Sequence, residues 1–423
     1  MSGVQWLRES RGFTTLLVSR IVSRVGDVLF TLATSWVVLT TSHSVVLAAL
    51  IPLAGSLPSI VFGLPLATLA DRWPKKSVLV FVDCGRGLLV LSAGLLLLDH
   101  HPVTGVFVGV MGLLAVGGLL FTPAITSVFP RMVPPEHLTR ANGLWAAVTS
   151  SLSIGSFAVG GLLVAWLTPA GALLVDGVSF LCSGAVLAIL RLPDVRSDTE
   201  GGLLGFLRES VAGVRYLWRD SYLRRLILLI APMNLVFGPM QIFSLVFSRL
   251  VLHLGTEGYG FIEAASGLGS VGAGLLVTRL APRLTLQTWL RIGTWGSGVT
   301  LALTLIFRDL PVAILGYGAI WFVTTVLSVP IVSSVQRTAP APLVGRVMQS
   351  LFLLTGGISV PLGLLLGSWA MNRFGAVSAL WAQALGFGTI GVVALVARFN
   401  PPAHHALDQE YRPGASAPRN PSP

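Results

Sequence analysis

Apolar runs of about 20 residues recur along the whole chain, and they constrain its fold more than any other feature. Each run is long enough to cross a bilayer as a helix. Strands of a membrane β-barrel would show short segments of alternating hydrophobicity, and these runs do not alternate. Charged residues make up only 11% of the sequence, against about 25% in soluble domains. The sequence therefore predicts an all-α membrane protein.

We identify twelve transmembrane helices by this criterion. The turn between the second and third contains Arg72, Lys75 and Lys76. Short loops rich in Lys and Arg stay on the cytoplasmic side, so this turn orients the chain and places both termini in the cytoplasm. The predicted spans are approximately 13–40, 45–70, 77–98, 103–127, 141–167, 171–191, 223–252, 257–280, 287–307, 311–335, 345–370 and 374–398.

The formal net charge of +11 follows from this topology and does not indicate nucleic-acid binding. Of the 28 Lys and Arg residues, only Arg249, Arg308 and Arg373 fall at predicted external turns. The bilayer, and no nucleic acid, is thus the expected partner. No small-residue cleavage site follows the first charged residues, so we expect no removable signal peptide.

Two halves of the chain resemble each other at an offset of about 207 residues. The segment 67–76 aligns with 274–283, and Asp27 aligns with Asn234. Such an internal repeat is typical of transporters built from two similar bundles. We expect a six-helix bundle over 1–191, a linker with an amphipathic helix over 192–222, a second six-helix bundle over 223–398, and a disordered tail over 399–423.

The first span carries Arg20, Arg24 and Asp27, which are spaced four and three residues apart and therefore share one helical face. Thr31 continues that face. Ionisable groups inside a span are costly and are typical of functional sites. We interpret Asp27 as the proton carrier, with Arg24 beside it. The alternative is an Arg24–Asp27 ion pair that only maintains packing.

Other acidic residues in the predicted spans have two interpretations each. Glu263 either takes part in proton coupling or reaches to the external surface. Asp176 either takes part in coupling or packs beside Ser179. Asp83 and Arg86 are assigned to a cytoplasmic charge network near the turn.

A cavity between the halves should hold an amphipathic, largely apolar ligand. Few fixed charges are present in the spans, which argues against sugar phosphates and dicarboxylates. The alternative for each aromatic residue is a lipid-facing or interfacial position. The candidate lining residues, which are aromatic or carry a neutral polar group, are Thr31, Trp36, Trp145, Asn234, Phe237, Gln241 and Trp321.

No nucleotide-binding motif of the form G-x-x-x-x-G-K-[ST] occurs, so we do not expect an ATPase. Cys84 and Cys182 lie in apolar segments without a CxxC or His-rich partner. We therefore predict neither cofactor nor metal, and we predict that the protein is not an enzyme.

Several motifs resemble the major facilitator superfamily over about residues 10–400. The turn Ala67–Lys76 is similar to the G-x-x-x-D-R-x-G-R/K-R/K loop of that superfamily, with Ala67 and Pro74 in place of its glycines. Residues 156–161 resemble the G-P-x-x-G-G element of antiporters, with Ser-Phe in place of Gly-Pro. The strings that resemble the bacterial branch of macrolide-efflux and enterobactin-exporter types are Ser23–Asp27, Phe121–Ala124, Pro130–Pro134, Ala141–Asn142, Asp176–Phe180 and Gly345–Met348.

The resemblance implies two six-helix bundles that alternate access to a central site, in a monomer of the bacterial inner membrane. It also implies a cytoplasmic gate, in which Asp71 at the end of span two faces Arg346 at the start of span eleven. At that position both the ion pair and the dipole of the helix N-terminus stabilise a carboxylate. The alternative, a positive-inside stop signal, accounts for Lys75 and Lys76 but not for Asp71.

We predict a secondary transporter that exports hydrophobic or amphipathic small molecules such as antibiotics, macrolides or siderophores in exchange for protons. Two alternatives stay open. The same charges would serve a proton-coupled importer, and a membrane-embedded lipid-handling protein would need catalytic groups clustered near one interface.

Overall fold

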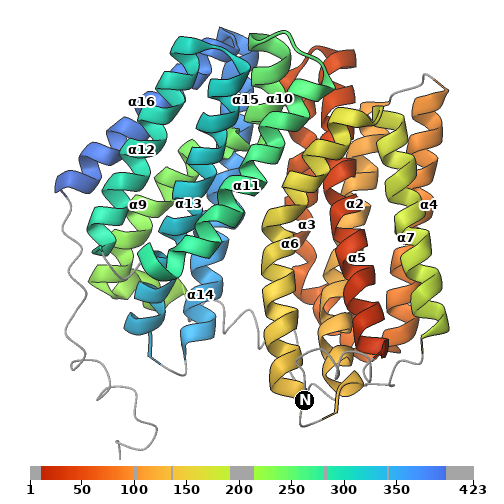
Figure 1. Cartoon of the computed structure of the whole chain (residues 1–423). Helices are drawn as coiled ribbons and strands as arrows, with labels where there is room; N and C mark the ends of the chain where they lie inside the picture. Colours follow the sequence, from red (N-terminus) through yellow and green to blue (C-terminus); the bar gives the residue numbers. More distant parts are fainter. Residues whose placement is uncertain are drawn as a thin grey trace, which may run out of the picture.

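The computed structural model describes residues 11–99, 103–134, 137–190, 214–280, 284–340 and 343–396, and these residues form helices and short connections without a strand. Figure 1 shows two groups of roughly parallel helices side by side. Each predicted span overlies one helical segment, so the all-α prediction is confirmed. Trp166, Ile189 and Phe81 are among the large apolar side chains on the outside, as a lipid-facing surface requires.

The helices of the N-terminal half are joined by tight turns. Thr168 ends one such turn by accepting a hydrogen bond from the Gly171 amide (3.1 Å), and Pro169 follows at the first helical position, where its missing N–H costs nothing. The elements are α2 (Arg11–Ser42), α3 (Val45–Arg72), α4 (Lys75–Leu98), α5 (Thr104–Val128) with η1 (Phe129–Met132), α6 (Leu138–Trp166) and α7 (Pro169–Ile189).

Two helical segments of the C-terminal half are irregular, which the sequence analysis did not predict. The first changes from α to 3₁₀ geometry at Gly238-Pro239, where Pro239 lacks an amide hydrogen. Both segments also contain a π-helical turn, a feature frequent at functional sites. The elements are α9 (Ser221–Phe237), η3 (Gly238–Ile242), α10 (Phe243–Val246), η4 (Phe247–Val251), α11 (Thr256–Leu280), α12 (Leu286–Phe307), α13 (Leu310–Thr338), α14 (Val344–Phe352), η7 (Leu353–Ile358), α15 (Ser359–Phe374) and α16 (Ala376–Val396).

Within the described residues, nine helical segments are long and apolar enough to cross a membrane. The long helices α2, α6 and α11 are not among those nine. The middle of α2 contains Arg20, Arg24 and Asp27, and α11 contains Glu263. The predicted count of twelve spans is thus confirmed for nine.

The two ends of the molecule can be told apart by the helix termini that lie there. In Figure 1, α2 begins at the lower end, and α2 ends and α3 begins at the upper end. Arg249, Arg308 and Arg373, which were predicted at external turns, belong to the segments η4, the end of α12 and the last turn of α15. In Figure 1 these segments end at the upper side.

The two halves meet along α6 and α11, and also along α3 and α15. Small residues allow the first contact, because the backbones approach closely. A Cβ atom at Gly161 would lie 2.5 Å from the Gly260 carbonyl oxygen, and one at Gly260 would lie 2.2 Å from the Gly161 carbonyl oxygen. Gly161 belongs to the antiporter-like element, whose neighbour Gly160 packs against Val28 of α2. This element therefore joins α6 both to its own half and to the other.

The predicted linker lies mostly outside the described residues. Residues 214–219 are helical, with Leu217 fully buried and Trp218 exposed. The predicted tail also lies outside them.

Candidate functional site

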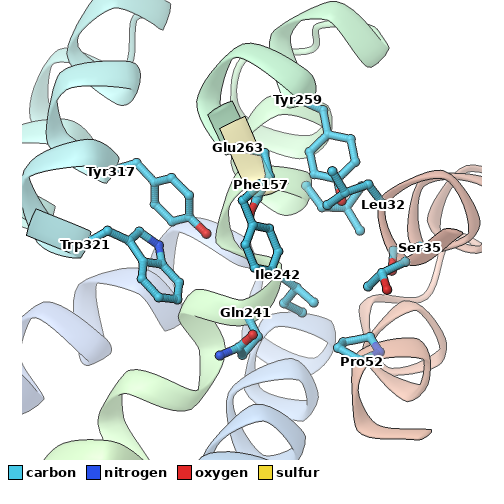
Figure 2. A pocket seen from close by; sticks show the side chains of 12 residues that line it. Leu32, Ser35, Pro52, Phe157, Gln241, Ile242, Tyr259, Glu263, Tyr317 and Trp321 are labelled. Atoms are coloured by element: carbon cyan, nitrogen blue, oxygen red, sulfur yellow. The ribbon is translucent and has the colours of Figure 1, made fainter. Parts of the chain in front are cut away.

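A small cavity of about 60 Å³ lies between the two halves. By volume it has room for a few water molecules. Figure 2 shows that the side chains around it come from both groups of helices. The N-terminal half contributes α2, α3 and α6, and the C-terminal half contributes η3, α10, α11 and α13. The lining residues are Thr31, Leu32, Ser35, Pro52, Phe157, Gln241, Ile242, Leu245, Tyr259, Glu263, Tyr317 and Trp321.

Glu263 is the only carboxylate among these lining residues. It is 5% exposed, and the Ser244 hydroxyl donates a hydrogen bond to its Oε2 atom. The Ser266 hydroxyl lies 3.4 Å from Oε1. The alternative that Glu263 reaches to the external surface is therefore wrong, because hydroxyl groups inside the C-terminal half hold the carboxylate at the cavity.

Aromatic rings surround this carboxylate and are themselves fixed by ring contacts. Tyr317 stacks on Phe243 with centroids 5.2 Å apart, and its hydroxyl donates to the Met240 carbonyl oxygen (2.9 Å). Trp321 makes an edge contact with Phe237 at 5.3 Å. Each such pair adds about 0.5–1.5 kcal/mol beyond burial, so these contacts stabilise the cavity wall on this side.

Three of the predicted cavity residues, Thr31, Gln241 and Trp321, line the cavity. Phe237 lies one contact behind it, against Trp321. Trp36 likewise lies one contact behind it, stacked on the lining residue Tyr259 at 5.7 Å. The structure places the other two elsewhere, and those two predictions are corrected. They are Trp145, which stacks on Phe129 at 4.7 Å, and Asn234, which donates to the Thr355 carbonyl oxygen at 3.0 Å.

Sequence reasoning missed Tyr259, Tyr317 and Ser244. Tyr259 was detectable in principle, since it precedes Glu263 by four residues and shares its helical face. Ser244 and Tyr317 are distant in sequence from Glu263 and carry no pattern that links them to it.

A second group of charges lies inside the N-terminal half. Asp27 pairs with Arg24 at 3.6 Å and lies 4.0 Å from a guanidinium nitrogen of Arg86. Arg86 is almost fully buried; it donates to the Leu114 carbonyl oxygen (2.6 Å) and lies over the Phe180 ring. We call Arg24, Asp27, Asp83, Arg86 and Asp176 the N-terminal charge cluster.

Asp83 and Arg86 were predicted to belong to the cytoplasmic gate, and the structure corrects this assignment. Arg86 faces Asp27 inside the bundle. Asp83 is fully buried and accepts a hydrogen bond from the Ser183 hydroxyl, which lies 2.5 Å from the Ser19 hydroxyl. The short sequence distance of Asp83 and Arg86 from the turn at Asp71 suggested the gate. The face of α4 on which both residues lie instead directs their side chains toward α2, α5 and α7.

Asp176 is fully buried, and neither of its carboxylate oxygens has a hydrogen-bond partner among the described residues. Its Oδ1 atom occupies the space next to Gly26, where a Cβ atom would lie 2.0 Å away. Ser179 donates only to the Asp176 backbone carbonyl oxygen (2.8 Å). Glycine at position 26 is therefore what lets this carboxyl group approach α2 beside Asp27.

The gate residues at the lower end are only partly described. α3 ends at Arg72, but the side chains of Asp71 and Arg72 lie outside the description. Lys75 is buried at the first position of α4, and Lys76 is half-buried. Arg346 lies in the first turn of α14. The Asp71–Arg346 contact stays a prediction.

The upper end holds contacts between the halves that sequence reasoning did not suggest. Asn372 Oδ1 accepts a hydrogen bond from the Val45 amide (3.0 Å), and its amide nitrogen lies 3.3 Å from the Ser44 hydroxyl. Arg249 lies over the Trp36 ring at 5.9 Å. Asn372 thus caps the first turn of α3 from the other half.

No group of three or more His, Cys, Asp or Glu side chains that could hold a metal ion occurs among the residues that the structure describes. The arrangement instead offers a cavity for an organic ligand and buried carboxyl groups.

The family model of the Major Facilitator Superfamily matches residues 16–349, which is most of the chain. The chain belongs to the major facilitator superfamily. This membership and the apolar helices identify it as a multi-pass membrane transporter, and they confirm the resemblance noted from its motifs.

Relatives of this superfamily member include efflux proteins. It is 28% identical over 400 residues to "Multidrug efflux pump Tap" of Mycolicibacterium fortuitum, covering 90% of this chain and 94% of that protein. It is 25% identical over 377 residues to "Macrolide efflux protein A" of Streptococcus pyogenes, covering 86% and 90%.

Among solved structures, a bacterial homologue of the human lysosomal transporter Spinster, described as inward-facing and occupied, has the same fold. The TM-score is 0.68 at 13% identity, covering 92% of this chain and 97% of that one. At this identity the likeness concerns the fold alone.

Proposed function

We propose that this transporter exports hydrophobic or amphipathic small molecules in exchange for protons, by alternating access. The observation that carries the proposal is the cavity between the halves, which has aromatic walls and one carboxylate, Glu263. Secondary transporters bind their substrates at such an interface. The names of the efflux relatives favour export over import.

The size of the cavity supports alternating access. A cavity of about 60 Å³ cannot enclose a drug-sized molecule, whose pocket measures about 300–1,000 Å³. Transport therefore requires the halves to separate on one side at a time. The contacts of Gly161 with Gly260, and of Asn372 with α3, hold the upper part together in this conformation.

We assign proton carriage to Asp27. Its side chain is 20% exposed and has an arginine on either side, Arg24 and Arg86, so both solvent and an opposite charge can reach the carboxylate. Thr31, one turn further along α2, donates to the Asp27 carbonyl oxygen and also lines the cavity. This turn of α2 connects the N-terminal charge cluster to the substrate space.

The gate at the lower end is assigned to Asp71, Arg72, Lys75, Lys76 and Arg346. Exchanging the charges, Asp71→Arg with Arg346→Asp, should restore part of the transport that either single change removes. Absence of rescue contradicts the gate. The lower end is then the cytoplasmic side of the inner membrane, and a single chain suffices for function.

Efflux measurements test the main proposal. Energised cells that express the protein should accumulate less of a macrolide or lipophilic dye than cells with an empty vector, and a protonophore should abolish the difference. Enhanced uptake on expression would favour the importer, and lipid turnover without flux would favour a lipid-handling protein.

Asp27→Asn tests the coupling in the same cells. Gradient-driven efflux should fall about tenfold or more, which corresponds to ~1.4 kcal/mol, while substrate exchange without a gradient persists. Intact gradient-driven efflux in this variant would exclude Asp27 as the proton carrier.

A further inference from the structure

Exposed arginines gather where the chain enters the C-terminal half. The helical segment 214–219 is attached there by Leu217, which is fully buried with the first apolar residues of α9. Asp220 ends this segment and accepts a hydrogen bond from the Leu223 amide (2.8 Å), which caps α9. In Figure 1, α9 begins at the lower end of the molecule. The arginine side chains that this stretch exposes are Arg215, Arg219, Arg224 and Arg225.

The segment 214–219 presents one face that combines two cations with an aromatic ring. Arg215, Trp218 and Arg219 share this face, because Trp218 and Arg219 follow Arg215 by three and four residues. The Trp218 side chain is 46% exposed. Tryptophan is enriched where a membrane meets water, with its ring at the level of the lipid headgroups. This face therefore suits the headgroup region of a bilayer.

The first two turns of α9 continue the pattern toward the bilayer interior. Arg224 and Arg225 precede the 57% exposed Leu228 by four and three residues, so all three share one face. These residues belong to the candidate span Ser221–Val251, and Leu228 lies about 5 Å further along the helix axis than the two arginines. A guanidinium nitrogen of Arg224 donates to the Trp218 carbonyl oxygen (3.3 Å), which joins the two faces. The joint surface has cations at its rim and an apolar side chain one turn deeper.

The protein does not neutralise these four arginines itself. No carboxylate among the described residues forms an ion pair with them. Asp220, the one carboxylate between residues 215 and 225, caps α9. By contrast, Arg291 of α12 is held by the Ala394 and Leu395 carbonyl oxygens (3.4 and 3.0 Å). The arginines at α9 thus keep most of their guanidinium donors for an external partner.

A further exposed arginine lies at the same end of the C-terminal half, on α13. The hydroxyl groups of Tyr222 in α9 and Ser334 in α13 are hydrogen-bonded to each other, so the start of α9 borders the end of α13. Arg337 follows Ser334 by three residues and is exposed. It therefore adds a fifth positive charge beside the start of α9.

We propose that these five arginines, with Trp218 and Leu228, bind an anionic phospholipid in the leaflet at the lower end of the molecule. The guanidinium groups bind the headgroup phosphate, because their planar fork matches two phosphate oxygens. The Trp218 ring lies at headgroup level, and an acyl chain lies along Leu228. Clusters of four or more Lys or Arg beside a membrane helix are typical of anionic-lipid sites. None of these residues lines the cavity between the halves, so the lipid site is separate from that cavity.

Lipid binding to the purified full chain in neutral detergent micelles tests this, with bound lipids counted by native mass spectrometry. The probes are dioleoylphosphatidylglycerol, which is anionic, and dioleoylphosphatidylcholine, which has no net charge. Arg219→Gln with Arg225→Gln should weaken phosphatidylglycerol binding about tenfold or more, because each cation near the headgroups contributes several-fold to anionic-lipid affinity. Phosphatidylcholine binding should not change.

Two further pairs of substitutions serve as controls. Arg308→Gln with Arg373→Gln removes the same charge from exposed positions at the upper end, and phosphatidylglycerol binding should stay within about twofold of the wild type. Arg219→Lys with Arg225→Lys keeps the charge but not the planar fork, and binding should stay within about threefold.

Four results would overturn the proposal. They are unchanged phosphatidylglycerol binding after Arg219→Gln with Arg225→Gln, equal weakening by the two glutamine pairs, a loss as large in the lysine pair as in the glutamine pair, and a wild type that binds phosphatidylcholine equally well. Excess inorganic phosphate should not displace the lipid, because Trp218 and Leu228 contact its apolar part; full displacement would assign the site to free phosphate and contradict a lipid site. The measurement uses no transported substrate, so its outcome is independent of the proposed export.

Discussion

The N-terminal charge cluster and the cavity at Glu263 both bury carboxylates, but the protein balances them in different ways. In the cluster, Arg24 and Arg86 supply the opposite charge to Asp27, and Arg86 is held by the Leu114 carbonyl oxygen and the Phe180 ring. At the cavity, the hydrogen bonds to the Glu263 carboxylate from described side chains come from hydroxyl groups. The difference thus concerns Asp27 and Glu263: the chain itself supplies the countercharge of Asp27, whereas no Lys, Arg or His among the described residues forms an ion pair with Glu263.

The largest expected effect tests the internal balance of the cluster. Arg86→Met leaves Asp27 without its buried partner and should lower the free energy of unfolding by about 3–5 kcal/mol. Arg24 is 37% exposed at its side chain, so Arg24→Gln should cost at most about 1 kcal/mol. Unfolding in mixed micelles measures both. Equal losses would mean that Arg86 is no more important than a surface pair.

The next prediction concerns the contact that closes the cavity. Gly260→Ala places a Cβ atom 2.2 Å from the Gly161 carbonyl oxygen, and such overpacking costs about 1–3 kcal/mol. Gly274→Ala, on the same helix with open space around it, should change stability by less than about 0.5 kcal/mol. Both variants can be compared by thermal unfolding and by efflux. If Gly260→Ala behaves like the control, the halves do not depend on this approach.

Glu263 itself should matter little for folding. In Glu263→Gln the amide oxygen still accepts the Ser244 hydrogen bond, so stability should change by no more than about 1 kcal/mol. Measuring the free energy of unfolding of Glu263→Gln and of Arg86→Met under the same conditions compares the two regions directly. A loss as large as that of Arg86→Met would show that Glu263 is structural, and the contrast between the regions would fail.

The smallest effect is expected at the upper end. Asn372→Ala removes the hydrogen bond to the Val45 amide in the first turn of α3 and should disfavour the upper-closed conformation by about 0.5–1.5 kcal/mol. Spin-label distances across the upper end should then show a larger open population. Asn372→Asp keeps an acceptor for the Val45 amide and should retain most of the closed population. If both variants shift alike, the amide cap does not hold this end.

Much of the fold was predictable because it follows from local patterns. The apolar runs defined each helix to within a few residues. The interruption at Gly238-Pro239 was not predicted. A proline near the middle of an apolar run does not by itself indicate 3₁₀ or π geometry, and here that geometry also depends on close packing against α15.

The site was less predictable. Asp27, Glu263, Gln241 and Trp321 stood out because polar or aromatic groups are conspicuous in a span. Arg86 was assigned to the wrong neighbours, because sequence distance from a charged turn does not say which helix a side chain faces. Trp145 and Asn234 were wrongly placed in the cavity for the same reason.

The sequence alone determined that the chain lies in a membrane, how its helices are delimited and which of them carry charge, since burial in lipid acts on every segment independently. Only the tertiary structure decided which charges meet. Arg86 reaches Asp27, and Tyr317 and Ser244 reach Glu263, because α-helices bring together side chains that are far apart in sequence. Which side chains meet depends on small residues such as Gly26 and Gly161, because these residues set the distance between neighbouring helices.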